Sequence, residues 1–168
     1  MSQKLADLDI RLTSRLRVAE RPGRLRSLAA ILAHSGDSLL WLPGLLLLWW
    51  RGTDFWRSRA RTLIIAILIT GAVVTAVKLV VRRRRPAGEW GALYRNTDPF
   101  SFPSGHAARA FMLAVIAIGL GPAWFAVALA IWAPLVSLAR AAMGVHYLSD
   151  VLAGIVLGLA IGVILIVL

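Results

Sequence analysis

The chain has 168 residues, 59% of them hydrophobic and 16% charged, with a net charge of +11 from 19 basic and 8 acidic side chains. Because a soluble domain usually carries about 25% charged residues, this composition predicts an integral membrane protein, and the basic residues flank apolar runs rather than forming the soluble patch that binds nucleic acid. The chain has no cysteine, which excludes disulfides, thiolate metal ligands and cysteine nucleophiles.

The first expected element is an amphipathic helix within residues 3–19. Its leucines recur at spacings of three and four, at Leu5, Leu8, Leu12 and Leu16, with charged residues between them. This pattern is typical of a helix that lies on a membrane surface and contacts membrane lipids. An Arg-Pro-Gly sequence at 21–23 ends it. We therefore assign residues 1–26 to an N-terminal amphipathic segment and residues 27–168 to one transmembrane domain.

Five apolar stretches follow the amphipathic segment. The first, 27–50, is interrupted by the polar sequence His-Ser-Gly-Asp at 34–37, which predicts a broken span or a re-entrant segment. Continuous spans are predicted over the other four stretches, 62–81, 103–120, 123–142 and 148–168. We therefore predict an all-α membrane bundle with five to six transmembrane or re-entrant helices.

The last of these spans contains a stripe of small residues. Gly154, Gly158 and Gly162 recur about once per helical turn. Small residues at this spacing allow two helix backbones to approach closely. The stripe therefore predicts that this span packs tightly against another helix.

Counting the crossings places the polar ends of the spans on one membrane face. The loop 51–61 is rich in arginine, which is typical of a cytoplasmic loop. If each stretch crosses once, the end of 62–81, the start of 103–120 and the link 141–147 all lie on the opposite face. Ionisable groups at membrane depth usually mark function, so we expect a functional site on that face.

A histidine and an aspartate stand at the start of the last span. His146 and Asp150 are separated by four residues, so on a helix they share one face. Asp150 would then accept a hydrogen bond from one ring nitrogen of His146 and make the other nitrogen more basic, as in catalytic triads. This pattern makes His146 a candidate nucleophile, although the pair alone is better explained by a structural contact at a helix start.

A second polar cluster opens the span 103–120. Pro103, Ser104, Gly105 and His106 form its first turn. Proline and glycine at a helix start leave backbone N–H groups pointing outward, where they bind phosphate, and His106 could donate a proton to a leaving oxygen. The alternative is an ordinary serine cap with the histidine at the membrane interface.

Two basic residues lie inside the apolar boundaries. Lys78 is a full turn inside the span 62–81, and Arg140 is inside the span 123–142. Buried cations need an anionic partner, which a bound phosphate would supply. The simpler interpretation of the adjacent arginine run, 82–85, is an anchor that sets topology.

Together these residues form three motifs: Lys78-x6-Arg85-Pro86, then Pro103-Ser104-Gly105-His106, then Arg140-x5-His146-x3-Asp150. They resemble, in order and spacing, the signature motifs of the type 2 phosphatidic acid phosphatase (PAP2, or lipid phosphate phosphatase) family, over roughly residues 60–165. One departure is Ala139, where the third motif often has serine.

The resemblance implies a role for each motif residue. His146 would attack phosphorus and form a phosphohistidine, Asp150 would orient it, and His106 would protonate the leaving group and then activate water. The phosphoryl oxygens would be held by Lys78, Arg85, Ser104, Gly105 and Arg140. No metal and no cofactor would be needed. Arg82, Arg83, Arg84 and Arg109 lie outside the motifs, and we interpret them as headgroup contacts or anchors.

The implied function is a multi-pass lipid phosphatase of the cell (inner) membrane, with its site facing the extracytoplasmic side, that releases inorganic phosphate from a lipid phosphate or pyrophosphate. The alternatives are a lipid phosphotransferase and a non-catalytic lipid-binding protein. The expected partners are the lipid phosphate substrate and membrane lipids, and no nucleic acid. The sequence does not choose among phosphatidic acid, phosphatidylglycerophosphate and a polyprenyl pyrophosphate, and it does not indicate an oligomeric state.

Overall fold

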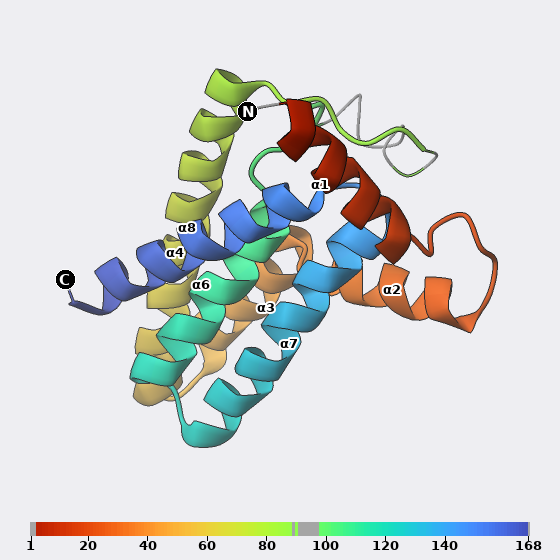
Figure 1. Ribbon diagram of the computed structural model, residues 1–168. Coiled ribbons are helices and arrows are strands. Elements are labelled where there is room, and N and C mark those ends of the chain that lie inside the picture. The colour runs from red at the N-terminus through yellow and green to blue at the C-terminus, as the bar shows by residue number, and fades with distance from the viewer. Residues whose placement is uncertain (1–2, 89, 91–97, 168) are drawn as a thin grey trace.

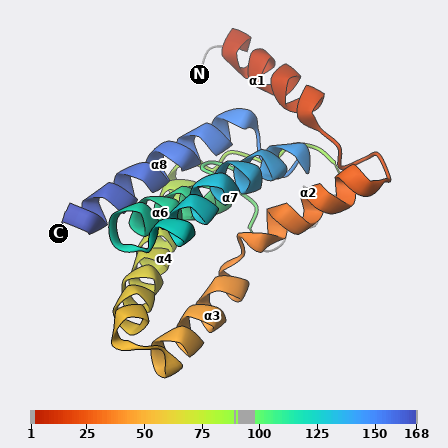
Figure 2. The ribbon, with the colours of Figure 1, turned by 90° about the horizontal axis from the view of Figure 1, so that it is seen from below.

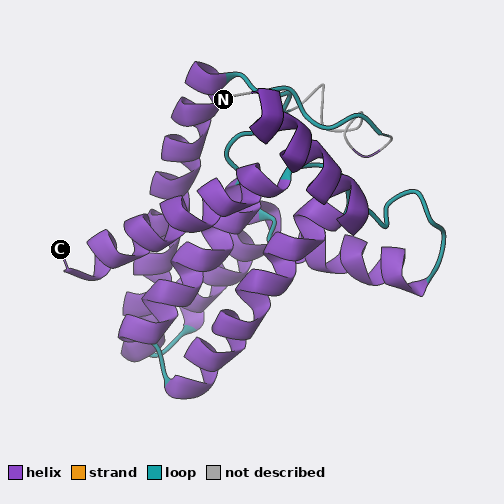
Figure 3. Ribbon diagram, in the orientation of Figure 1, coloured by secondary structure: helices purple, strands orange, loops and turns teal. Residues whose placement is uncertain are grey.

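The computed structural model describes residues 3–88, 90 and 98–167. Within these ranges the chain is helical and contains no strand, apart from one isolated antiparallel bridge between Arg84 and Phe100 (Figures 1 and 3). The helices are α1 (Gln3–Leu16), α2 (Arg24–Ser35), α3 (Ser38–Arg51), α4 (Asp54–Val81), α6 (Gly105–Leu120), α7 (Ala123–Ala142) and α8 (Leu148–Val167). The predicted all-α class is confirmed.

The apolar helices differ in their ability to cross a membrane. Among the described residues, three helices are long and apolar enough to do so alone, namely α4, α7 and α8. Helices α2 and α3 together are long and apolar enough to cross, but they are bent by 51° at a short break, as predicted for the interrupted stretch. Helix α6 is apolar but has only 16 residues, which gives a length of about 24 Å. The predicted passes therefore correspond to three long helices, one broken pair and one short helix.

Helices α3 and α4 meet at the turn that joins them and then diverge, while α6, α7 and α8 pack beside them (Figure 2). The hydrophobic core lies among α3, α4, α6 and α7, where Leu63, Leu113 and Val136 are buried. This arrangement leaves the C-terminal end of α4 beside the N-terminal end of α6.

The predicted glycine stripe brings α6 and α8 into close contact. A Cβ atom added at Gly154 would lie 2.4 Å from the carbonyl oxygen of Ser104, and one at Gly158 would lie 2.1 Å from that of Ala108. No side chain fits at such distances, so the close approach predicted from the sequence is confirmed. The two helices run parallel, and their starts meet where the amide of Ser104 donates to the carbonyl of Asp150 at 2.9 Å.

Helix α1 confirms the predicted N-terminal helix, and it turns polar residues to the protein. Its polar residues Asp9 and Thr13 are buried, whereas Leu5 and Leu8 are exposed. The contact of its leucines with lipid stays a prediction. Helix α2 begins at Arg24, directly after the break predicted at 21–23, and the division of the chain after residue 26 stays a prediction.

The substitution Gly158→Ala should destabilise the protein by about 1–3 kcal/mol, because the added methyl meets backbone rather than a movable side chain. Thermal unfolding in detergent measures the effect. Gly44→Ala is the matched control, since a Cβ there has nothing within 4 Å, and its unfolding temperature should stay equal or rise. Equal unfolding temperatures for the two variants would contradict the packing described.

Candidate active site

Four chain segments meet at the active-site end of the bundle: the end of α4, the start of α6, the link between α7 and α8, and the break between α2 and α3. The first three, together with the loop 98–100, line a cavity of about 440 Å³, and the break between α2 and α3 contacts the cavity residue His106 through Asp37. Its polar lining comes largely from Lys78, Asp98, Gly105, His106, Arg109 and His146. Of the other predicted site residues, Arg85, Ser104, Arg140 and Asp150 are buried behind this wall. All eight predicted residues therefore lie at one end of the bundle.

Hydrogen bonds define which ring nitrogen of His146 is available for attack. Its Nδ1 lies 2.7 Å from the carbonyl oxygen of Ser101, which can only accept, so Nδ1 carries the hydrogen. Its Nε2 lies 3.2 Å from a guanidinium nitrogen of Arg85, which can only donate. The lone pair of Nε2 is therefore the nucleophilic position, and it faces the cations of the site.

The predicted hydrogen bond between His146 and Asp150 is wrong. The Nδ1 atom lies 3.8 Å from Oδ2 of Asp150, which is an ion-pair distance and too long for a hydrogen bond. Instead, Asp150 accepts from the guanidinium of Arg83 at 2.6 Å and from the amide of Tyr147 at 2.9 Å. Because these donors occupy the carboxylate, the carbonyl of Ser101 orients the imidazole in its place.

The surroundings of His146 favour its neutral form. Its side chain is buried in the link between α7 and α8. Burial, together with the positive charges of Arg140, Arg85 and Lys78, holds the pKa of His146 well below its ordinary value of 6.5. A neutral imidazole keeps its lone pair, as a nucleophile requires.

The carboxylate of Asp98 binds two of the predicted phosphate ligands. Its Oδ2 accepts from the ammonium of Lys78 and, at 2.7 Å, from the guanidinium of Arg85. Burial raises the pKa of Asp98, but the hydrogen bond and charge of Lys78 outweigh it, so that the pKa lies below its usual value and the carboxylate is charged. The anion that the sequence predicted beside Lys78 is thus supplied by this loop residue, at the place where phosphate is expected.

His106 is held by an aspartate at the break between α2 and α3. Its Nε2 lies 2.5 Å from Oδ1 of Asp37, whose other oxygen lies 3.1 Å from Nδ1 of His34. A carboxylate only accepts, so Nε2 carries a hydrogen and Nδ1 is the nitrogen that can exchange a proton with a reacting group. Arg109 donates to the carbonyl of Gly36 and fixes the same break.

At the start of α6, Ser104 acts as a helix cap. Its hydroxyl accepts from the amide of Ala107 at 3.5 Å, which is the alternative considered for this motif. The next residue, Gly105, lines the cavity. Amides in the first turn of a helix have no acceptor within the helix, so those of Gly105 and His106 are suited to a phosphoryl oxygen.

Sequence reasoning missed four residues of this site: Asp9, Asp37, Asp98 and Ser101. Asp37 gave a signal, because it stands in a polar break of an apolar run, but only the break was interpreted. The interpretation of Arg83 as a headgroup contact or anchor is wrong, since it lies between two carboxylates, 2.7 Å from Asp9 and 2.6 Å from Asp150.

The family model of the PAP2 superfamily matches residues 59–168. The chain belongs to this superfamily. Its relatives include a decaprenylphosphoryl-5-phosphoribose phosphatase of Mycobacterium tuberculosis, 32% identical over 153 residues that cover 88% of this chain and 81% of the relative. An undecaprenyl-diphosphatase of Sulfolobus acidocaldarius is 34% identical over 140 residues, which cover 80% of this chain and 66% of the relative.

Solved structures of PAP2 enzymes share the fold. A transmembrane PAP2-type phosphatidylglycerolphosphate phosphatase from Bacillus subtilis superimposes with a TM-score of 0.77 at 22% identity, covering 98% of this chain and 85% of that one. LpxE of Aquifex aeolicus gives a TM-score of 0.75 at 25% identity and covers 96% of both chains. The family resemblance that the three motifs predicted is confirmed, whereas the roles of the individual site residues stay predictions.

Within the part of the PAP2 chain that the structure describes, no group of three or more His, Asp or Glu side chains is placed to hold a metal ion. The positive charge around the cavity comes from Lys78, Arg85, Arg109 and Arg140. These side chains suit phosphoryl oxygens, because guanidinium and ammonium groups bind them through charge-assisted hydrogen bonds.

The substitution Gly105→Ala should leave the fold intact and lower kcat/KM by roughly 10- to 100-fold, because a misplacement of about 1 Å at a reacting group costs that much. A Cβ at this position would meet only Val74 Cγ1, at the ordinary distance of 3.4 Å, yet it would project from the cavity wall. Steady-state kinetics and thermal unfolding measure the two effects. Unchanged kinetics would argue against phosphate binding at this turn.

Proposed function

We propose that the chain hydrolyses the phosphate ester or diphosphate of a membrane lipid through a phosphohistidine on His146. Hydrolysis of membrane lipid phosphates is the activity that the PAP2 family and the relatives support. The observation that carries the residue assignment is the lone pair of His146 Nε2, which faces a cluster of cations, with His106 lining the same cavity.

In the first step, Nε2 of His146 attacks phosphorus, the P–N bond forms and the bond to the lipid oxygen breaks. His106 gives its proton to that oxygen. The phosphoryl group takes the place of the Asp98 carboxylate against Lys78 and Arg85, and its third oxygen meets the amide of Gly105. Positive groups already in position stabilise the charge that develops on these oxygens.

In the second step, His106 accepts a proton from water, the water oxygen attacks phosphorus, and the P–N bond breaks to release inorganic phosphate and regenerate His146. Asp37 stabilises the imidazolium form of His106, which is present before the first step and is restored by the second, because its carboxylate lies 2.5 Å from Nε2. Asp150 acts indirectly, because it accepts hydrogen bonds from Tyr147 and Arg83, which lie beside the nucleophile.

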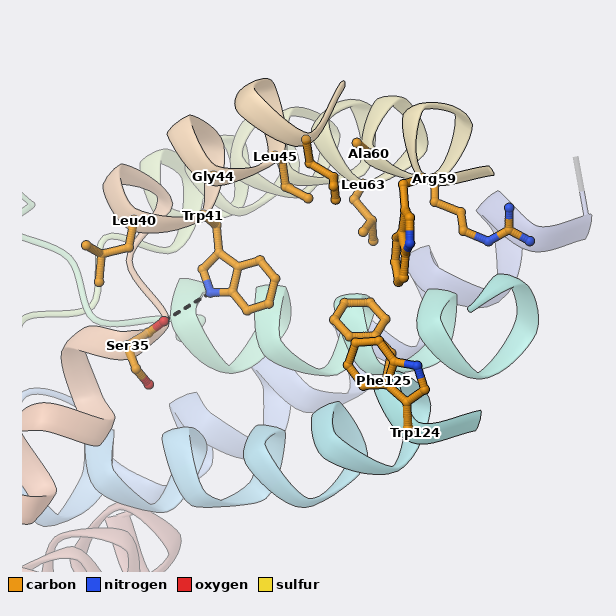
Figure 4. A pocket seen from close by; sticks show the side chains of 12 residues that line it. Ser35, Leu40, Trp41, Gly44, Leu45, Arg59, Ala60, Leu63, Trp124 and Phe125 are labelled. Atoms are coloured by element: carbon orange, nitrogen blue, oxygen red, sulfur yellow. Dashed lines mark hydrogen bonds between the residues drawn. The ribbon is translucent and has the colours of Figure 1, made fainter. Parts of the chain in front are cut away.

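A second, apolar cavity is suited to the lipid tail. It has a volume of about 510 Å³ and lies between α3, α4 and α7, where Trp41, Leu63 and Phe125 line it (Figure 4). On α4, Leu63 shares a face with the buried residues Ile67, Thr70, Val74 and Lys78. Thr70, Val74 and Lys78 of this face line the phosphate cavity. The two cavities therefore adjoin the same face of α4, with the buried core residue Ile67 between them.

The tail is best matched by a polyprenyl chain. The groove is lined by aromatic rings, and the names of two relatives describe phosphatases of decaprenyl and undecaprenyl lipids. We place the site on the extracytoplasmic face of the inner membrane, because Arg57, Arg59 and Arg61 lie at the other end of α4, where a cytoplasmic loop is expected.

Purified protein in detergent with EDTA should release inorganic phosphate from a panel of polyprenyl phosphates, polyprenyl diphosphates, phosphatidic acid and phosphatidylglycerophosphate. His146→Asn should lower release at least about 10⁴-fold, since removing a nucleophile of a coupled catalytic set has effects of this size. The asparagine amide replaces Nδ1 as the donor to Ser101, which keeps the fold. If this variant retains turnover, His146 is not the nucleophile. If the wild-type protein transfers the phosphoryl group to an added alcohol and releases no free phosphate, it is a phosphotransferase.

Filling the apolar groove should affect long-tailed substrates alone. In Gly44→Phe the new side chain enters the groove, because Gly44 lines it and a Cβ there has nothing within 4 Å. We expect KM for a polyprenyl phosphate to rise by about 10-fold, since each buried CH₂ of a tail contributes about 0.8 kcal/mol, while hydrolysis of a short water-soluble phosphate ester stays the same. Leu47→Phe, on the exposed side of the same helix, is the control. An equal KM in both variants would place the tail elsewhere.

A further inference from the structure

The start of helix α8 is capped by residues of α1. The first amides of a helix need acceptors from outside it, usually from a polar residue just before the helix. For α8 the acceptors come from far away in sequence: the amide of Leu148 donates to the hydroxyl of Thr13, and that of Ser149 donates to the carboxylate of Asp9, both at 3.0 Å. The polar face of α1 is thus used to complete the helix that follows His146.

The same aspartate holds a guanidinium that reaches the active site. The second oxygen of Asp9 accepts from Arg83 at 2.7 Å, and the other end of this guanidinium donates to Asp150 at 2.6 Å. The guanidinium also lies over the ring of Tyr147, at 4.1 Å from its centroid. Both carboxylates are buried, with exposed fractions of 7% for Asp9 and 0% for Asp150. One cation therefore bridges two buried anions, and the loss of either anion changes its position.

Arg83 contacts the surroundings of His146 by two routes. Through Asp150 it reaches the amide of Tyr147, the residue next to His146. Through its own carbonyl it accepts the amide of Ser101 at 2.8 Å, and the carbonyl of Ser101 in turn orients the imidazole of His146. A displacement of the Arg83 side chain therefore acts on the main chain beside the nucleophile, and a displacement of its main chain acts on the acceptor that fixes the ring.

We propose that Asp9 is a positioning residue for His146. Helix α1 would then help to set the geometry of the active site as well as lie on the membrane surface. This inference rests on the proposed role of His146 as the nucleophile. Helix α1 lies before residue 59, where the match to the PAP2 family model begins, so Asp9 is outside the matched region. Asp9 does not line the cavity; it acts through Arg83 and through the start of α8, where it accepts from Ser149.

The test compares Asp9→Asn with Asp7→Asn, an exposed aspartate on the same helix. The asparagine at position 9 can still accept from Ser149, but it no longer carries the charge that holds Arg83. We expect kcat to fall by about 10-fold or more, because small displacements of a reacting group have large effects, while KM stays the same because no substrate contact is lost. Asp7→Asn should have wild-type kinetics. Unchanged kcat in Asp9→Asn, or a rise in KM alone, would overturn the proposal.

Two further variants separate positioning from general stability. Asp9→Glu keeps the charge beside Arg83 and should recover part of kcat even if its unfolding temperature is as low as that of Asp9→Asn. In the double variant of Asp9→Asn and Arg83→Gln, kcat should be no lower than in Arg83→Gln alone, because residues that act through one contact are not additive. Multiplicative losses, or a glutamate variant no more active than the asparagine variant, would overturn the proposal.

The outcome is distinguishable from failure of the proposed function. If His146→Asn keeps its activity, the nucleophile is wrong and the inference falls with it. If His146→Asn is inactive and Asp9→Asn is fully active, only the role of α1 is refuted.

Discussion

A cation in an apolar bundle needs an anion beside it, and the active-site end of this protein is organised by that requirement. Lys78 and Arg85 share the carboxylate of Asp98, and Arg83 lies between Asp9 and Asp150. Arg83 joins residues that are 67 and 74 positions away in sequence, so its ion pairs connect α1 and the start of α8 as well as neutralising charge. Removing one partner leaves a buried charge, which is far more costly than the pair itself. A phosphoryl group suits the same arrangement, because it can replace Asp98 without leaving either cation unpaired.

Much of the fold followed from the sequence because its signals are local. Apolar length predicted the spans, a polar break predicted the bend between α2 and α3, and the glycine stripe predicted the tight packing of α8 on α6. The three motifs predicted the PAP2 family. Their spacing places every predicted site residue at one end of the bundle, although the chemical role of each residue is still a prediction.

The partners of these residues were harder to predict. A spacing of four residues puts Asp150 within reach of His146, but it does not reveal that Arg83 and the amide of Tyr147 compete for the same oxygens. In the same way, the leucine pattern of α1 indicated the apolar face and gave no sign that Asp9 and Thr13 would cap a helix from 135 to 140 residues away. Such contacts depend on tertiary packing, which periodicity does not encode.

The capping of α8 by residues of α1 also links the membrane side of the N-terminal helix to the membrane side of the active site. Because Asp9 contacts Ser149 and Arg83 directly, the N-terminal helix lies on the same membrane face as the cavity. Residues 3–16 must therefore lie in the same compartment as the lipid headgroup. If the headgroup is extracytoplasmic, this segment has to cross the membrane, although its basic residues favour the cytoplasmic side. The sidedness of the enzyme can thus be read from its first helix, for instance by the accessibility of Lys4 to a membrane-impermeant amine reagent, without any assay of turnover.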